Sequence, residues 1–143
     1  MAMLAFRKRL LGMLDDQGRH HWERYAGTDL EGRSVVVVGV GSVGTAVAKM
    51  ARAFGMRTVG VKRTIAGVDA GELHLDALFG FEDLHAAIGG AEHVVLAAPH
   101  TTETEGLIGE TELGLLATGA VVVNVSRGAL LDEAALGDAL ESG

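Results

Sequence analysis

Cysteine is absent from the 143 residues, proline occurs once, and only four Phe, one Trp and one Tyr supply aromatic rings. Without cysteine the chain has neither a disulfide framework nor a thiol nucleophile. No apolar run reaches the roughly 20 residues that span a bilayer. The apolar stretch after Arg7, Lys8 and Arg9 is short and is interrupted by Gly12, unlike that of a signal peptide. We therefore expect a cytoplasmic protein that makes no membrane contact.

Positive charge is also scarce, because 12 Lys and Arg stand against 19 Asp and Glu, for a net charge of −7. General nucleic-acid binding needs a basic face, so this class of function is excluded. The histidines His74, His85 and His93 lack the spacing of a metal site, so we expect no metal. The length fits one domain with a sizeable core.

Glycine, by contrast, is abundant, and three of the 21 glycines form a G-x-G-x-x-G motif. Val35–Val38 predicts a buried strand before it, and the Ala-rich stretch Thr45–Phe54 predicts a helix after it. In such a turn Gly39 permits the tight bend, Gly41 lets a pyrophosphate approach the backbone, and Gly44 lets helix and strand pack closely. The free N–H groups and the dipole of the helix N-terminus favour phosphate. The motif therefore predicts a dinucleotide-binding turn.

Strand and helix patterns alternate from residue 34 onward. Continuous apolar runs separated by helices indicate a parallel sheet covered on both faces, and right-handed crossovers make it an α/β doubly wound (Rossmann) sheet. Residues 64–73 are expected to be a loop, and the pattern near 75–78 indicates no definite element. The predicted strands are 35–38, 57–61, 93–97 and 120–125, and the predicted helices are 43–54, 81–88, 110–116 and 132–140.

The N-terminal segment has a different pattern. Leu4, Leu11 and Leu14 lie on one face of a single amphipathic helix predicted over residues 1–24. Such a helix packs on the following domain, on another subunit, or on a domain outside this sequence. We therefore expect residues 1–26 to be a linker or interface segment and residues 27–143 to be the dinucleotide-binding domain.

Ligands of doubly wound sheets lie at the carboxyl ends of the strands, so the residues after each strand are candidates. Lys62, Arg63 and Thr64 follow the second strand, where NAD-specific proteins place Asp or Glu for the ribose hydroxyl. Two cations and a hydroxyl suit a 2′-phosphate, which predicts NADP rather than NAD. The alternative is that one of them solvates a strand end.

Arg127 follows the last strand and is the candidate for gripping a substrate carboxylate with its planar guanidinium. The alternative is an arginine that bonds loop carbonyls. Ser42 and Ser126 lack a nucleophile elbow and are interpreted as phosphate or ribose contacts. His100 stands at a strand end but is a weak candidate for a catalytic base.

Four motifs together resemble the cofactor-binding domain of the D-isomer-specific 2-hydroxyacid dehydrogenases. Jointly they are highly specific and span nearly the whole chain. They comprise residues 39–44 (GVGSVG), 53–57 (AFGMR), 99–109 (PHTTETEGLIG) and 124–136 (NVSRGALLDEAAL).

The resemblance implies hydride transfer between NAD(P)H and the C2 carbon of a 2-keto acid, giving a D-2-hydroxy acid. Arg127 matches the arginine that binds the substrate carboxylate and carbonyl, and Lys62 stands where NAD users have Asp. We expect NADP as the cofactor, with NAD as the alternative. The cofactor-binding positions are expected to be Gly39, Gly41, Ser42, Val43, Gly44, Lys62, Arg63, Thr64, Pro99, Thr104, Val125 and Ser126.

The family's general acid, a histidine with a carboxylate, lies downstream of the arginine motif, as does the next strand. Its substrate domain is separate. We therefore expect the sheet to be incomplete at its C-terminal side and the chain to be inactive alone, and we expect a homodimer. The alternative function is a non-catalytic nucleotide-binding or dimerisation module. An S-adenosylmethionine or flavin nucleotide ligand is disfavoured by the combination of residues 99–109 with 124–128.

Overall fold

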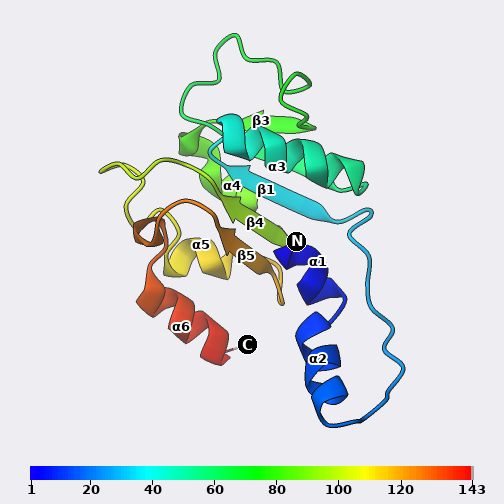
Figure 1. Cartoon of the computed structure of the whole chain (residues 1–143). Coiled ribbons are helices and arrows are strands. Elements are labelled where there is room, and N and C mark those ends of the chain that lie inside the picture. The colour runs from blue at the N-terminus through cyan, green and yellow to red at the C-terminus, as the bar shows by residue number, and fades with distance from the viewer. Residues whose placement is uncertain (143) are drawn as a thin grey trace.

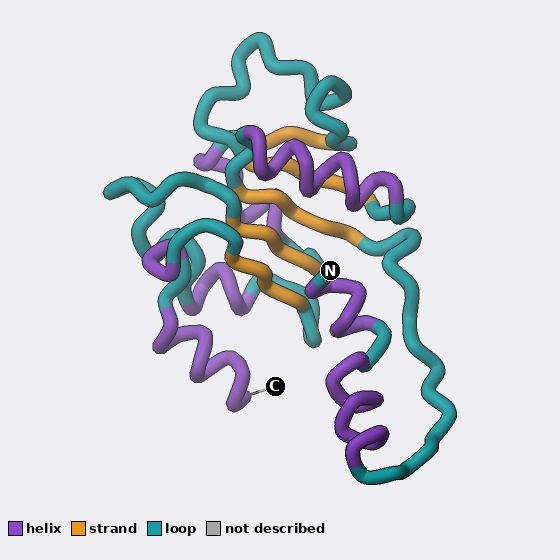
Figure 2. Tube along the Cα trace, in the orientation of Figure 1, coloured by secondary structure: helices purple, strands orange, loops and turns teal. Residues whose placement is uncertain are grey.

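The computed structural model describes residues 1–142 and contains a five-stranded, all-parallel sheet with the order β3-β2-β1-β4-β5 (Figures 1 and 2). From β1 the chain adds β2 and β3 on one side and then β4 and β5 on the other side. This order confirms the doubly wound α/β fold. Val36 of β1 is opposite Val59 of β2 and Val94 of β4. The strands are β1 (Ser34–Val38), β2 (Arg57–Val61), β3 (Ala77–Phe79), β4 (His93–Leu96) and β5 (Val121–Asn124).

The apolar residues of the central strands β1, β2 and β4 are buried on both faces, as their apolar runs predict, whereas the edge strands β3 and β5 are only half-buried. Val36 and Val38 pack into a core with Ile88, whereas Val35 and Val37 pack into a separate core on the other face. This alternation follows from the two-residue period of a strand. The valine side chains of one short strand thus contact the layers on both faces, and this packing fixes the position of the glycine turn that follows the strand.

Most predicted helices are confirmed, with shifts of a few residues at their ends. The stretch 81–88 divides into a 3₁₀ turn and a short helix, and a second 3₁₀ turn follows β5, where the sequence predicts none. The short strand β3 occupies the region in which the sequence pattern indicates no definite element. The helices and turns are α3 (Ser42–Ala53), η1 (Phe81–Asp83), α4 (Leu84–Ile88), α5 (Glu110–Gly114), η2 (Gly128–Leu130) and α6 (Glu133–Ser142).

The single helix predicted over residues 1–24 is wrong. The segment forms α1 (Ala2–Arg7) and α2 (Leu10–Gly18), separated at Arg9, whose φ of 54° is left-handed. A long loop then returns to β1 (Figure 2). Met3 and Leu4 pack against one core of the sheet, but no residue of α2 is buried. The break thus separates a helix that packs on the sheet, α1, from one that has no buried residue, α2.

Within the part of the chain that the structure describes, no helix is both long and apolar enough to cross a membrane.

Candidate functional site

A cleft of about 320 Å³ lies at the carboxyl edge of the sheet, where the loops after β1, β2 and β4 meet. Backbone hydrogen bonds continue past the strand ends, from Gly39 N–H to Val61 O and from Ala97 N–H to Val38 O, both at 2.8 Å. The strands therefore hold the start of each loop in register. The cleft is lined by Gly39, Val40, Gly41, Lys62, Arg63, Thr64, Phe81, Ala97, Ala98, Pro99, Thr101 and Thr104.

The three motif glycines form the first wall of this site. Gly39 has a φ of 96°, and a Cβ there would lie 2.3 Å from the Ala98 nitrogen. A Cβ at Gly44 would lie 2.1 Å from the Gly39 carbonyl oxygen and 3.1 Å from Val37 Cγ1, so helix and strand pack as closely as the motif predicts. A Cβ added at Gly41 would meet no other part of the chain within 4 Å. Two glycines therefore serve packing, while the third, Gly41, lines the open space of the cleft.

Helix α3 begins directly after Gly41 and has no side-chain cap at its N-terminus. The first N–H groups of a helix have no partner within it, and here no side-chain cap supplies one; the positive end of the helix dipole faces the turn. Ser42 and Val43 occupy this first turn, but their side chains border a groove on the outer side of α3 rather than the cleft. They can contribute backbone N–H groups to an anion at the turn.

The cations after β2 line the cleft but have different partners. Lys62 Nζ donates to the carbonyl oxygen of Val40 in the glycine turn, at 3.2 Å. Arg63 forms an ion pair with Glu103, 2.7 Å between guanidinium nitrogen and carboxylate oxygen. Thr64 is exposed. The structure therefore brings the three predicted residues together, with Arg63 bound to a carboxylate that the sequence does not predict.

Pro99 and Thr104 lie together in the loop after β4. The Thr104 side chain is buried, its Oγ1 donates to the Pro99 carbonyl at 2.7 Å, and it accepts from the Thr101 N–H at 2.8 Å. These two hydrogen bonds of the buried hydroxyl hold the loop in its conformation. A cofactor would meet the loop surface that this hydroxyl fixes.

The residues after β5 lie at the same edge, beyond the lining of the cleft. Ser126 Oγ donates to the Ala98 carbonyl, which ties this loop to the one after β4. Asn124 braces the loop from both sides, with Nδ2 donating to Arg127 O at 2.8 Å and Oδ1 accepting from Ser126 N–H at 2.9 Å. Arg127 is exposed, and Val125 is 51% exposed. The guanidinium of Arg127 also donates to the Ser126 carbonyl at 3.1 Å, and it remains accessible to an anion.

Histidine contributes little to this edge. His93 is fully buried at the amino edge of the sheet, where Nδ1 lies 2.9 Å from Ser34 O and Nε2 accepts from Arg7 Nε at 3.2 Å. Burial lowers the pKa of His93, and the bond that Nε2 accepts from Arg7 also favours the neutral ring. His100 follows β4 but is exposed, with its Nε2 3.9 Å from Glu105. Residues 1–142 contain no group of three or more His, Cys, Asp or Glu placed to hold a metal.

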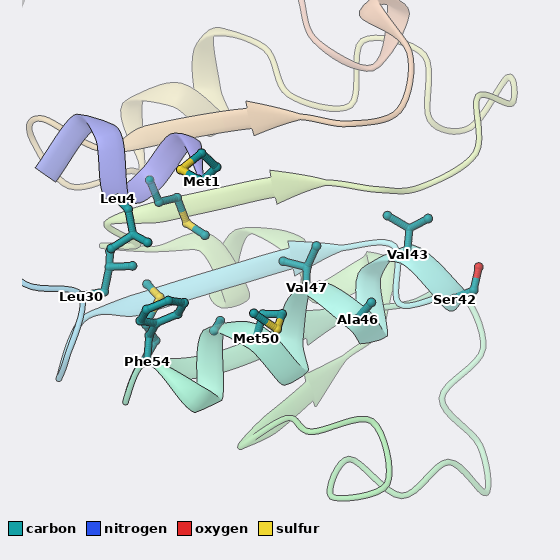
Figure 3. A pocket seen from close by; sticks show the side chains of 12 residues that line it. Met1, Leu4, Leu30, Ser42, Val43, Ala46, Val47, Met50 and Phe54 are labelled. Atoms are coloured by element: carbon teal, nitrogen blue, oxygen red, sulfur yellow. The ribbon is translucent and has the colours of Figure 1, made fainter. Parts of the chain in front are cut away.

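An apolar groove of about 550 Å³ runs between α1 and α3. Figure 3 shows Leu4 and Leu30 near Phe54 at one end, and Val43 at the other. The side chains of α3 that line it recur every three or four residues, and Met50 remains 59% exposed. This apolar face of α3 comprises Val43, Ala46, Val47 and Met50, together with Phe54 directly after the helix.

Sequence reasoning missed Glu103, Asn124 and Phe81 as parts of this edge. Glu103 and Asn124 lie inside the motifs 99–109 and 124–136, and their position directly beside strand-end residues is the available indication. Phe81 gives no such indication, because it belongs to a 3₁₀ turn after the short strand β3.

Comparison with known proteins places residues 1–143 in the NAD binding domain of D-isomer specific 2-hydroxyacid dehydrogenases. The D-3-phosphoglycerate dehydrogenase of Mycobacterium leprae is 36% identical over 146 residues, covering 100% of this chain and 27% of that enzyme. The glyoxylate reductase of Thermococcus gammatolerans is 34% identical over 150 residues, covering 99% of this chain and 44% of that enzyme.

Solved structures are similar over the same extent. A D-isomer specific 2-hydroxyacid dehydrogenase from Xanthobacter autotrophicus Py2, in complex with NADPH and MES, has a TM-score of 0.84 and 31% identity. The match covers 99% of this chain and 44% of that one. The chain thus spans less than half the length of each of these proteins.

Proposed function

The chain belongs to the D-isomer specific 2-hydroxyacid dehydrogenases, whose NAD binding domain it matches along its length, and from that premise we propose its role in the reaction. It is the cofactor-binding part of an oxidoreductase that interconverts 2-keto acids and D-2-hydroxy acids. The observation that supports this role best is the cleft bordered by Gly41 and the uncapped start of α3. Open space, free N–H donors and nearby cations fit a dinucleotide.

In this proposal the N–H groups of Ser42 and Val43 bind the pyrophosphate, with Gly39, Gly41 and Gly44 shaping the turn. The loops that contain Pro99, Thr104, Val125 and Ser126 border the nicotinamide half. When bound, the nicotinamide supplies or accepts the hydride. The two loops orient the nicotinamide ring. Hydrogen bonds such as that from Ser126 Oγ to Ala98 O hold the loops in position beside it.

Arg127 is proposed to bind the substrate carboxylate and to polarise the keto oxygen that gains charge during hydride transfer. Its accessible guanidinium and the brace from Asn124 support this assignment. The proton donor is proposed to be a histidine outside these 143 residues, since His93 is buried at the opposite edge and His100 is exposed beside Glu105. The chain alone should therefore bind cofactor without turnover.

NADPH is the proposed preferred cofactor. Arg63 and Lys62 stand after β2, and the Xanthobacter autotrophicus relative was solved with NADPH. Calorimetric titration of the chain with NADPH and NADH tests the preference. We expect tighter binding of NADPH, and Arg63→Gln should weaken NADPH about 10-fold or more while leaving NADH unchanged, because charge-assisted bonds contribute about 1.5–3 kcal/mol. Tighter binding of NADH by the unaltered chain would contradict the preference.

Turnover is tested in the same preparation with NADPH and glyoxylate, hydroxypyruvate or pyruvate. No oxidation of NADPH is expected from the chain alone. Measurable turnover would mean that the proton donor lies within residues 1–143, with His100 as the first residue to substitute.

We also propose a homodimer that forms through the apolar face of α3 and the segment 1–26. In this proposal residues 1–26 are the linker and interface segment, and residues 27–143 are the dinucleotide-binding domain. The groove between α1 and α3, open to solvent in the single chain, supports this assembly. It is also the observation that favours the second candidate function, a non-catalytic dimerisation module. Titration separates the two candidates, since a module of that kind would bind neither NADPH nor NADH.

A further inference from the structure

We propose that Glu103 is a specificity-determining residue of the cleft, because it holds the guanidinium that a 2′-phosphate would need. This inference rests on the proposed function, in which Arg63 meets the 2′-phosphate of NADPH. Glu103 would then lower the preference for NADPH over NADH by competing for the same donors.

The ion pair joins two loops that belong to different strands. Arg63 follows β2 and lines the cleft, while Glu103 lies in the loop after β4, and the guanidinium nitrogen is 2.7 Å from the carboxylate oxygen. Among the residues that the structure describes, the contact between His100 Nε2 and the Glu105 carboxylate, 3.9 Å apart, stays within one loop. The Arg63–Glu103 pair therefore links the two sides of the cleft at the predicted 2′-phosphate position.

Neighbouring contacts keep Glu103 in place. The adjacent Thr104 is buried, and its hydroxyl bonds both Pro99 O and Thr101 N–H. Bonds within its own loop thus hold the backbone next to Glu103. The carboxylate is presented to Arg63 before any ligand arrives.

Lys62 does not replace Arg63 in this role, because its ammonium group donates to Val40 O in the glycine turn. Arg63 is consequently the cation on which a 2′-phosphate depends. A phosphate that binds Arg63 must either displace the Glu103 carboxylate or share the guanidinium with it. Sharing is unfavourable because the phosphate and the carboxylate are both negatively charged and repel each other. NADH has a hydroxyl at this position, so its binding does not require Arg63 to be released from Glu103.

Both side chains are more than half exposed, at 56% and 68%, so the competition is moderate. Exposed ion pairs couple weakly, which corresponds to a change of about two- to fivefold in affinity. We expect Glu103→Gln to tighten NADPH by that factor in calorimetric titration and to leave NADH unchanged. Glu105→Gln is the matched control, because it removes the same charge two residues further along the loop without touching Arg63.

The variant Arg63→Gln separates this inference from the proposed function. If Arg63→Gln weakens NADPH but Glu103→Gln does not tighten it, the competition is wrong and the NADPH site stands. If Arg63→Gln changes nothing, or neither nucleotide binds, both are wrong. If Glu103→Gln tightens NADPH equally in the Arg63→Gln background, or tightens NADH equally, or if Glu105→Gln has the same effect, the residue acts by general charge and the competition is wrong.

Discussion

The glycines of the turn after β1 show how differently residues of one type can be constrained. Gly39 is required by its positive φ and by the close approach of Ala98, and Gly44 by contact with the Gly39 carbonyl. Gly41 has an extended backbone conformation and no neighbour at its missing side chain. Only at Gly41 does the absence of a side chain leave room for a ligand rather than for the protein itself.

Substituting these glycines should therefore separate stability from binding. Gly44→Ala should lower the free energy of unfolding by about 1–3 kcal/mol, because the added methyl group meets backbone that cannot move freely. Gly41→Ser should leave stability nearly unchanged, since serine is a good residue at a helix N-cap, but should weaken NADPH binding. Urea unfolding and calorimetric titration of both variants check this expectation. Equal losses of stability in the two variants would contradict it.

At the scale of elements, the amino edge of the sheet anchors the N-terminal segment. Arg7 of α1 donates to His93 of β4, and the ring of His93 also bonds Ser34 O of β1. Arg33 pairs with Glu92, whose carboxylate accepts from the Ser34 N–H. Burial alone would raise the pKa of Glu92, but these hydrogen bonds and Arg33 hold it below its usual value. The helix α1 therefore docks on a polar network as well as on the apolar core.

This network should make the stability of the folded protein depend on pH. Burial lowers the folded-state pKa of His93, so the unfolded chain binds its proton more readily. Stability is then fully present above the unfolded pKa of about 6.5 and is lost as the pH falls through the depressed folded value. Arg7 and Arg33 repel a charged ring and Glu92 attracts it, with burial as the larger effect.

The measurement is the free energy of unfolding by urea between pH 7.5 and pH 5. The contribution of His93 should approach, at most, about 1.4 kcal/mol per pH unit, the limit for one proton. His93→Asn keeps a donor toward Ser34 O and is expected to be less stable but to have a flatter pH dependence. An unchanged slope in this variant would assign the pH dependence to other groups.

At the scale of the whole molecule, the exposed apolar face of α3 makes a specific prediction about assembly. Met50 is 59% exposed in the single chain, so Met50→Asp should fold normally. In a homodimer the same carboxylate would be buried without a partner, which strongly destabilises an interface. Light scattering after size-exclusion chromatography should show two chains for the unaltered protein and one for this variant.

Leu140→Asp is the matched control for that experiment. Leu140 is 74% exposed on α6 and does not line the groove, so a charge there should leave the mass unchanged. If the unaltered chain is already monomeric, the proposed homodimer is wrong. If a dimer persists in Met50→Asp, the apolar face of α3 does not form its interface.

Local sequence determined a large part of the fold and of the candidate site. Apolar runs specified the parallel strands, and the spacing of Gly39, Gly41 and Gly44 specified the turn, because periodicity and backbone freedom are local properties. The residues after each strand could be predicted to share one edge for a related reason: parallel strands end on the same side of a sheet. Family motifs added the role proposed for Arg127.

Tertiary structure alone decided which partners these residues have. Nothing local indicates that Glu103 reaches Arg63, that Thr104 turns its hydroxyl inward, or that His93 is buried against Arg7. The position of α1 has the same origin, since α1 packs against strands whose residues lie far along the chain. Contacts between distant segments follow from how the elements pack, and that packing has no counterpart in the spacing of neighbouring residues.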